Sequence, residues 1–432
     1  MAYVKKADRE KAELAQATVV KTPTVKSTST KGVSALSRAR TALKKTLVSD
    51  HSVPLTPELL TSTMPHLSTG SVNLDYLIGG RPNKMGVPPC PGWPRGRISN
   101  LYGNSGAGKT TLALTTAARV CEAGGTVCYI DWEYEVEPRY ASVLGVPIED
   151  EDRFSLQQPE TLEDGMKIMV QMAADGVDLI VIDSVGAGIP QDLYHRALKE
   201  EGNQSRPGLV AQKWSQFLPK FKNILTKSNT TVIGVSQLRK TISSMSGGGP
   251  ESAPQGGEAW KFYSAVRMML RVFSKEKTKQ WNGVSGKSEE MVTGAIVLAK
   301  LDKCKVSDAV HQEQRFFLRS GTGIDNDKSV LDMAVNYGII IKSGAWYEWP
   351  GGPEGSIRTQ GMEALQKAIS ADKKNIPLLF SQVVPRLNSA SPTAITSSPL
   401  EEAEDLDDIF SIVPGGADAL EDAPPEEGGD EG

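Results

Sequence analysis

The chain has 432 residues and a formal net charge of −4, with 39% hydrophobic and 23% charged residues. This composition is typical of a globular protein with two or three domains, and no apolar run approaches the ~20 residues that cross a bilayer, which excludes a membrane-spanning protein. The four cysteines form no CxxC pair, which argues against a disulfide framework or a zinc site and favours a reducing compartment. The N-terminal residues lack the apolar stretch of a secretory signal, so we expect a cytoplasmic protein.

Charge is distributed unevenly along the chain. Residues 1–50 carry 11 Lys and Arg against 4 Asp and Glu, whereas residues 401–432 carry 13 Asp and Glu and no Lys or Arg. We interpret residues 1–60 as a basic arm in which the apolar spacing of residues 33–48 predicts a helix for oligomerisation. Residues 388–432 are predicted to be a linker and a disordered acidic tail. The tail either competes with a polyanion for basic surface or is simply solvated, and charge alone does not decide.

A phosphate-binding motif lies at residues 103–110, which read G-x-x-x-x-G-K-T. A predicted strand at 98–102 precedes it and a predicted helix at 110–120 follows it, as this motif requires. Its glycines let backbone N–H groups converge on phosphate oxygens, and the helix N-terminus adds partial positive charge. We expect Lys109 to contact phosphates and Thr110 to ligate Mg²⁺. The nucleotide-binding residues predicted here are Gly103, Asn104, Ser105, Gly106, Ala107, Gly108, Lys109, Thr110 and Thr111.

Apolar strands then alternate with amphipathic helices. Strands are predicted at 127–132, 177–185 and 231–235, and the helices between them favour a parallel sheet covered on both faces. Period-two patterns near 266–272, 295–299 and 315–319 predict an antiparallel extension. The predicted fold class is therefore α/β, with a core at 61–328 and a small α+β domain at 329–387.

Polar side chains are predicted at the carboxyl ends of these strands, where open α/β sheets bind ligands. Asp183 ends the strand L-I-V-I-D and can reach Mg²⁺ directly or through water. Glu133 ends another predicted strand, C-Y-I-D-W-E, and could polarise an attacking water, but Asp131 and Glu135 are rivals that spacing does not separate. Gln237 follows a third strand, where an amide can sense the terminal phosphate.

Two loops follow these strands. Residues 190–208 are polar and partly basic, and residues 240–257 are too rich in Gly and Ser to pack. The second is either a plain surface loop or one that becomes ordered on a ligand.

Several segments together resemble the RecA recombinase family over roughly residues 60–350. The first are S-T-G-S-V-N-L-D-Y-L-I-G-G at 68–80, the phosphate-binding motif, and Y-I-D-W-E-Y-E-V-E-P-R-Y-A-S-V-L-G-V at 129–146. Further segments follow in the family's order at 177–185, 228–239, 256–267 and 342–347. The resemblance implies a RecA-type ATPase core that uses ATP and Mg²⁺.

The resemblance also implies roles for individual residues. Glu133 becomes the water-activating carboxylate and Gln237 the γ-phosphate sensor, with Lys109 completing the catalytic set. Tyr140 matches a tyrosine that stacks on adenine, and Glu137 stands where an acidic residue approaches the base. Lys261 and Phe262 match residues at a subunit interface. Lys303 and Lys305 match paired lysines that reach the ATP of a neighbouring protomer.

The region 190–208 departs from the family pattern. Gln212 and Pro219 stand where the bacterial proteins carry arginines near DNA. The DNA-binding residues predicted instead are Arg196, Lys199, Arg206, Lys213, Arg239, Gly256 and Gly257. We expect a recombinase that forms helical filaments on single-stranded DNA and pairs it with homologous double-stranded DNA. The alternatives are a ring helicase on the same core, and a DNA-coating protein that uses ATP only as a structural switch.

Overall fold

The computed structural model describes a large part of the chain. The described residues are Thr41, 62–82, 88–198, 208–240, 252–282, 287–309, 312–353 and 355–389. The predicted helix at 33–48 lies outside this part except for Thr41, which is helical. The predicted acidic tail lies outside it entirely.

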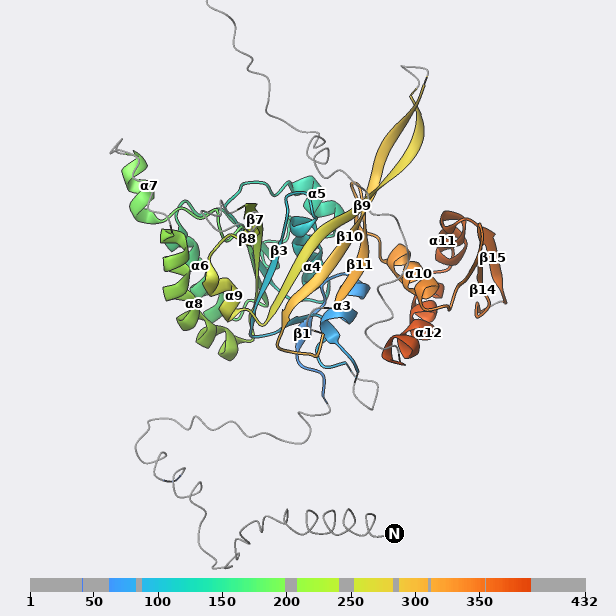
Figure 1. Cartoon of the computed structure of the whole chain (residues 1–432). Coiled ribbons are helices and arrows are strands. Elements are labelled where there is room, and N and C mark those ends of the chain that lie inside the picture. Colours follow the sequence, from blue (N-terminus) through green and yellow to red (C-terminus); the bar gives the residue numbers. More distant parts are fainter. Residues whose placement is uncertain are drawn as a thin grey trace, which may run out of the picture. The chain divides into compact units, whose positions relative to one another are not determined.

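A central sheet organises the core (Figure 1), with strand order β12-β11-β10-β9-β3-β7-β6-β4-β5 and β8 added beside β7. Its strands are β3 (Ile98–Gly103), β4 (Val127–Asp131), β5 (Phe154–Gln157), β6 (Leu179–Asp183), β7 (Thr231–Lys240), β8 (Ser252–Pro254), β9 (Val266–Asn282), β10 (Lys287–Cys304), β11 (Glu313–Arg319) and β12 (Gly323–Ile324). Strands β5, β4, β6, β7, β3 and β9 are parallel, whereas β10, β11 and β12 continue the sheet antiparallel. The predicted fold class is confirmed.

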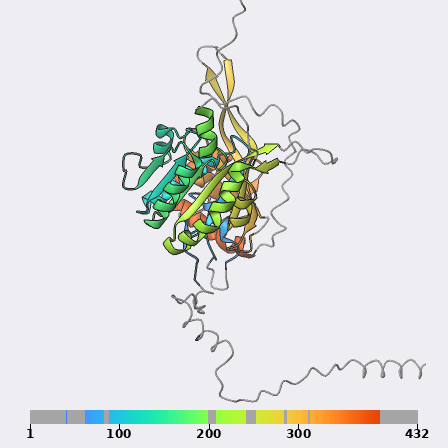
Figure 2. The same ribbon diagram turned by 90° about the vertical axis from the view of Figure 1, so that its left-hand side faces the viewer.

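Helices cover both faces of the parallel strands, which explains why these strands are apolar throughout. On one face, α4 packs with α3 against Leu101, Tyr129 and Val181. On the other face, α6, α8 and α9 pack against Ile130 and Ile182. Figure 2 looks onto the side of the molecule that carries α6 and α8, with the green helices in front of the strands. The helices are α3 (Val72–Gly79), α4 (Lys109–Glu122), α5 (Pro138–Val143), α6 (Leu162–Ala174), α7 (Gln191–Leu198), α8 (Leu209–Ser228) and α9 (Glu258–Tyr263).

Two smaller sheets accompany the central one. The first joins β1 (His66–Leu67) to β2 (Trp93–Pro94) before β3 begins. The second belongs to a C-terminal unit with its own core around Trp349, Leu365 and Leu379. Its elements are α10 (Asn326–Asn336), β13 (Ile341–Ser343), β14 (Trp346–Trp349), β15 (Ile357–Gln360), α11 (Met362–Ser370) and α12 (Asn375–Ser389). Helix α10 includes residues on both sides of the predicted domain boundary at 328/329.

Candidate nucleotide-binding site

The phosphate-binding motif forms the turn between β3 and α4. Strand β3 lies between β7 and β9, and all six of its residues are buried, which fixes the start of the turn. A Cβ atom at Gly103 would lie 2.1 Å from the carbonyl oxygen of Leu270 on β9, so only glycine fits there. Gly108 is the N-cap of α4 in the left-handed conformation at φ 81°. The turn is therefore held by backbone geometry that Gly103 and Gly108 permit.

The start of α4 fits an anionic ligand. No side chain caps this helix, so its first N–H groups are not satisfied by a capping oxygen. An uncapped helix N-terminus beside a buried ammonium group is suited to phosphate. That ammonium belongs to Lys109, which is 7% exposed and donates from Nζ to the carbonyl oxygen of Asn104 at 2.7 Å. Burial lowers the pKa of Lys109, while the carboxylates of Asp183 and Glu133 favour its charged form.

Asp183 lies directly opposite Thr110. Its Oδ2 accepts hydrogen bonds from Thr110 Oγ1 at 2.8 Å and from the Tyr129 hydroxyl at 2.8 Å. Burial raises the pKa of Asp183 to about 6, against the two hydrogen bonds that favour its ionised form. A hydroxyl and a carboxylate with hard oxygen atoms suit Mg²⁺, which completes its shell with water and phosphate. Within the described residues no group of three or more His, Cys, Asp or Glu side chains could hold a metal, so these two residues need such additional ligands.

Glu133 lies in a turn after β4, and this corrects the prediction that it ends the strand. The strand stops at Asp131, and Tyr134 has a positive φ of 57°, so the alternation expected for Asp131, Glu133 and Glu135 does not apply. Glu133 accepts from the Ser184 hydroxyl through Oε1, and Gln237 Nε2 donates to Oε2 at 3.1 Å. The turn therefore brings a carboxylate from β4 to the end of β6 and to Gln237. Gln237 lies within β7, which extends to Lys240, so the prediction that it follows its strand is wrong.

The two rival carboxylates are placed differently. Asp131 is 1% exposed and accepts from the backbone N–H groups of Glu133, Glu135 and Val136, so it closes the turn. Glu135 is exposed as a residue, but partial burial of its carboxylate, together with the charge of Glu133, raises its pKa. Only Glu133 among these three is hydrogen-bonded to Gln237 in the described structure.

The residues predicted to surround the base lie at the start of α5. The Tyr140 hydroxyl is 3.0 Å from Thr111 Oγ1 on α4, which joins the two helices next to the phosphate-binding turn. Glu137 caps α5, and its carboxylate accepts from the N–H groups of Arg139 and Tyr140. The Glu137 side chain is thus already engaged with its own helix.

Lys303 and Lys305 lie away from the chain's own phosphate-binding turn. Lys303 Nζ donates to the carbonyl oxygens of Lys261 and Phe262 at 2.6 and 2.8 Å, at the end of α9. Helix α9 covers the sheet face opposite to α4. Burial and the nearby positive charges of Lys305 and Arg267 lower the pKa of Lys303 to about 8. Phe262 is 70% exposed beside this cluster.

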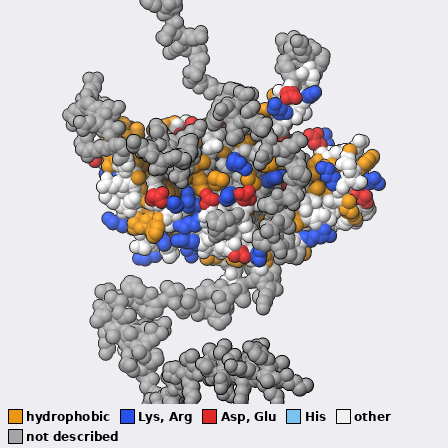
Figure 3. All heavy atoms as spheres, viewed as in Figure 1, with side chains coloured by type: hydrophobic (Ala, Val, Ile, Leu, Met, Phe, Trp, Pro, Cys, Tyr) orange, Lys and Arg blue, Asp and Glu red, His pale blue; other side chains and the backbone are white. Residues whose placement is uncertain are grey.

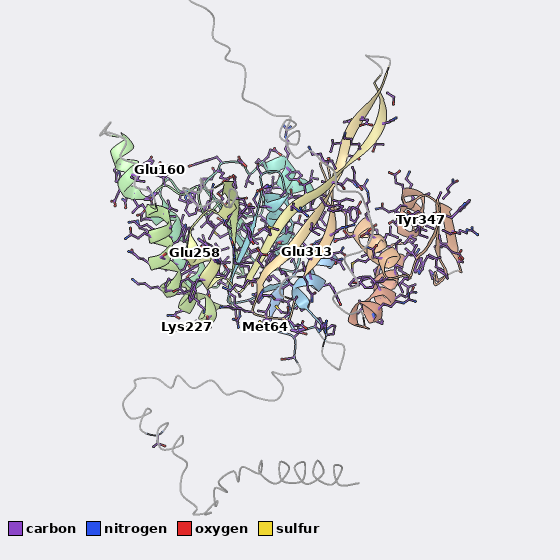
Figure 4. All side chains as sticks on the ribbon, in the orientation of Figure 1. Met64, Glu160, Lys227, Glu258, Glu313 and Tyr347 are labelled. Carbon is purple, nitrogen blue, oxygen red and sulfur yellow. The ribbon has the colours of Figure 1, made fainter. Side chains whose placement is uncertain are left out.

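Basic side chains gather over the region of α8 and α9 in Figure 3. Figure 4 labels Lys227 near the end of α8 and Glu258 at the start of α9. The cluster around Lys303 includes Lys222 of α8 among the cations that act on its pKa. The structure thus combines an exposed aromatic ring and several cations on one surface.

The residues predicted to bind DNA are only partly described. Lys213 forms an ion pair with Glu163 of α6 at 2.8 Å. Gly256 and Gly257 have positive φ values of 93° and 83°, and Gly257 lies against Ala211 of α8. For Arg196 and Arg239 only the backbone is described, in α7 and β7. Lys199 and Arg206 lie outside the described residues.

Sequence reasoning missed two hydroxyl donors in this site. Ser184 follows Asp183 directly and donates to Glu133, whereas Tyr129 reaches Asp183 from the neighbouring strand. Strand alternation could have found Tyr129, because it lies two residues before Asp131 on β4. No pattern in the sequence indicated Ser184.

The fold and this site define a P-loop protein that binds a nucleoside triphosphate at the carboxyl edge of a parallel sheet. Residues 35–324 match the family described as the RecA N-terminal domain. The chain belongs to the RecA family, and family membership supports a RecA-type function in recombination and repair with ATP and DNA binding.

Several bacterial relatives are similar over most of their length. Protein RecA of Borrelia hermsii is 36% identical over 302 residues, covering 70% of this chain and 77% of that protein. Protein RecA of Bordetella pertussis is 34% identical over 340 residues, covering 78% and 86%. A crystal structure of the RadB recombinase aligns with 60% of this chain and 98% of its own at 22% identity and a TM-score of 0.40, too low to support an inference about function.

No helix in the described residues has the length and apolar character needed to span a membrane.

Proposed function

We propose that the chain is an ATP-dependent DNA recombinase that forms helical filaments on single-stranded DNA and catalyses homologous pairing and strand exchange. The observation that carries this proposal is the contact between Glu133 and Gln237. It joins the carboxylate best placed to act on a water molecule to the strand that leads into the Gly-rich segment 240–257. Hydrolysis chemistry and the DNA-binding segment are then coupled through one side-chain pair.

The residues of the site have separate roles in ATP hydrolysis. Lys109 and the N-terminus of α4 bind the phosphates of ATP, and Thr110 and Asp183 hold Mg²⁺, which neutralises charge that develops on the phosphate oxygens. Glu133 orients water and accepts its proton, which is general base catalysis. Ser184 and Gln237 hold the Glu133 carboxylate from two sides. The Tyr140 ring stacks on the adenine base.

ATP is proposed to lie between two protomers. Lys303 and Lys305 lie at the end of α9, on the sheet face opposite to α4. They are therefore poorly placed for their own chain's phosphates and well placed to meet those of a neighbour. Assembly and hydrolysis depend on each other in this arrangement, which is expected to operate in the bacterial or phage-infected cytoplasm.

DNA contacts are proposed for the segments 190–208 and 240–257, through Arg196, Lys199, Arg206, Lys213 and Arg239 with Gly256 and Gly257. Cations that contact phosphates bind with little sequence preference and strong salt dependence. When Gln237 contacts the terminal phosphate of ATP, the DNA-binding state becomes more populated.

A strand-exchange assay combined with electron microscopy tests this function. With ATP, Mg²⁺ and single-stranded DNA, we expect helical filaments and joint molecules with homologous duplex. Closed rings that unwind forked DNA would indicate a helicase instead. Strand exchange that continues over many rounds with Glu133→Gln would indicate a protein that uses ATP only as a structural switch.

A further inference from the structure

Three tryptophans form a chain of ring contacts on the sheet face that carries α6, α8 and α9. We refer to Trp132, Trp214 and Trp260 as the tryptophan cluster. The rings of Trp132 and Trp214 meet edge to face with centroids 6.3 Å apart, and those of Trp214 and Trp260 meet at 5.1 Å. All three side chains are buried, at 7%, 0% and 1% exposure. Edge-to-face pairs are directional contacts, so the rings constrain one another's orientation.

Each ring comes from a different part of the proposed mechanism. Trp132 directly precedes Glu133 in the turn after β4. Trp214 lies in the second turn of α8, the helix that follows the segment 190–208. Trp260 lies in α9, which follows the segment 240–257. The cluster thus connects the hydrolytic turn to the helices that follow both proposed DNA-binding segments.

Two of the rings occupy the space that a side chain would need at a neighbouring glycine. A Cβ atom at Gly165 of α6 would lie 2.2 Å from Cζ2 of Trp132, and one at Gly234 of β7 would lie 2.3 Å from Cζ3 of Trp260. Interiors packed this closely transmit displacements instead of absorbing them. A shift of the Trp132 ring is therefore passed to Trp214, and from there to Trp260.

Two of the three indoles have no hydrogen-bond partner in the part of the chain that the structure describes. Trp214 Nε1 donates to the carbonyl oxygen of Val185 at 2.9 Å, two residues after Asp183 ends β6. In contrast, Nε1 of Trp132 and Nε1 of Trp260 are buried with no partner among the described residues. Leaving a buried donor unpaired costs free energy. The cluster therefore has a physical reason to adopt a second arrangement in another ligand state.

We infer that the tryptophan cluster transmits the nucleotide state at Glu133 to α8 and α9, and thereby sets the affinity of the chain for single-stranded DNA. This inference rests on the proposed function. The three tryptophans act as positioning residues that contact neither ATP nor DNA. A backbone link from Gln237 toward α9 also exists, because Gln255 N donates to the Gln237 carbonyl oxygen at 3.0 Å. The tryptophan cluster additionally connects Glu133 to α8. Coupling is reciprocal, so DNA held by the segments before α8 and α9 positions Glu133 in turn.

The test compares Trp132→Phe and Trp214→Phe with the control Trp349→Phe. Trp349 is also fully buried, but it lies in the C-terminal unit and donates to Gln382. The dissociation constant of a labelled oligothymidylate is measured by anisotropy with and without adenosine 5′-(γ-thio)triphosphate, and thermal unfolding checks each fold. The coupling ratio is the dissociation constant without the analogue divided by the constant with it. We expect this ratio to fall at least about fivefold in both cluster variants, within the usual range of coupling between sites. The control should keep the wild-type ratio.

The outcomes separate this inference from the proposed function. If the affinity of the wild-type chain for oligothymidylate does not depend on nucleotide, the proposed function itself is wrong. If the wild type depends on nucleotide and both cluster variants retain its ratio, the inference is wrong. Hydrogen exchange of the wild-type chain covers the case in which a variant does not fold. At a concentration where the chain is monomeric by light scattering, the nucleotide analogue should slow exchange in residues 209–218, and unchanged exchange there overturns the inference.

Discussion

Gln237 and Glu133 are joined by one side-chain amide, whose Nε2 lies 3.1 and 3.2 Å from the two carboxylate oxygens of Glu133. The two residues come from β7 and from the turn after β4, which are separated in the sheet by β6. A neutral donor fixes the carboxylate without cancelling its charge, so Glu133 keeps its capacity to accept a proton. The same amide can also meet a terminal phosphate, which gives Gln237 two competing partners.

Glu133→Gln should abolish most ATP hydrolysis while ATP still binds. The amide is nearly the same size as the carboxylate but cannot accept a proton, and a positioned general base contributes about 10²–10⁴-fold to a rate. Steady-state hydrolysis and equilibrium binding of a fluorescent ATP analogue measure the two effects. Glu135→Gln is the matched control, because Glu135 is exposed two residues away and should retain hydrolysis within about twofold. The opposite pattern would assign the base to Glu135.

Gln237→Ala should uncouple DNA binding from ATP. Without the amide, neither Glu133 nor the terminal phosphate has a side-chain contact to β7, so the DNA-binding state loses the part of its nucleotide dependence that passes through this strand. We expect ATP affinity to change little, because Lys109 and α4 supply the phosphate contacts. The ratio of oligothymidylate affinities with and without the ATP analogue measures this coupling. Gln237→Glu should be at least as impaired, since a second carboxylate beside Glu133 repels it. A wild-type ratio in both variants would remove Gln237 from the mechanism.

The sequence predicted the fold and the phosphate-binding turn because both leave local patterns. Buried parallel strands are apolar throughout, and Gly103 and Gly108 are required by close approach and by a left-handed conformation. The turn after β4 left no such pattern. Spacing does not distinguish Asp131, Glu133 and Glu135. Only the folded turn shows that the Asp131 carboxylate accepts hydrogen bonds from three backbone N–H groups.

The tryptophan cluster was also not predictable from sequence. Trp132, Trp214 and Trp260 are far apart along the chain, and a buried aromatic residue in an apolar helix or strand reads simply as core. Their contacts depend on how α8 and α9 pack on the sheet and on glycines such as Gly165 and Gly234 that admit the rings. Such long-range packing has no periodic signature.

The stability of the chain should change with pH through Asp75 of α3. Burial raises the pKa of Asp75 from 3.8 to about 6, although Ser68 Oγ and Thr69 N donate to its carboxylate. The folded state therefore binds a proton more readily than the unfolded state between about pH 4 and pH 6, and the unfolding free energy falls as the pH rises through this range. The full shift corresponds to about 3 kcal/mol, which is an upper limit because the side chain is partly exposed.

Asp75→Asn removes this titration and tests the assignment. Urea unfolding of wild type and variant between pH 4.5 and pH 7 gives two curves, and their difference isolates Asp75 from the other carboxylates. We expect the variant to gain stability relative to wild type as the pH rises from 4.5 to about 6, and then to hold a constant difference. A difference that does not vary with pH would show that Asp75 titrates normally.

Two inactive variants should restore each other's activity if ATP lies between protomers. Lys109→Ala removes the phosphate contact on one side of the interface, and the double substitution Lys303→Ala with Lys305→Ala removes the other side. Each variant alone should lose DNA-stimulated hydrolysis. In a random equimolar mixture, about a quarter of head-to-tail interfaces combine the intact side of each chain, so activity should return to about that fraction of wild type. Hydrolysis measured across mixing ratios should peak near equal amounts. Mixtures that stay inactive at every ratio, although both variants still assemble on DNA by electron microscopy, would place all three of these lysines at one protomer's own site or remove Lys303 and Lys305 from the reaction.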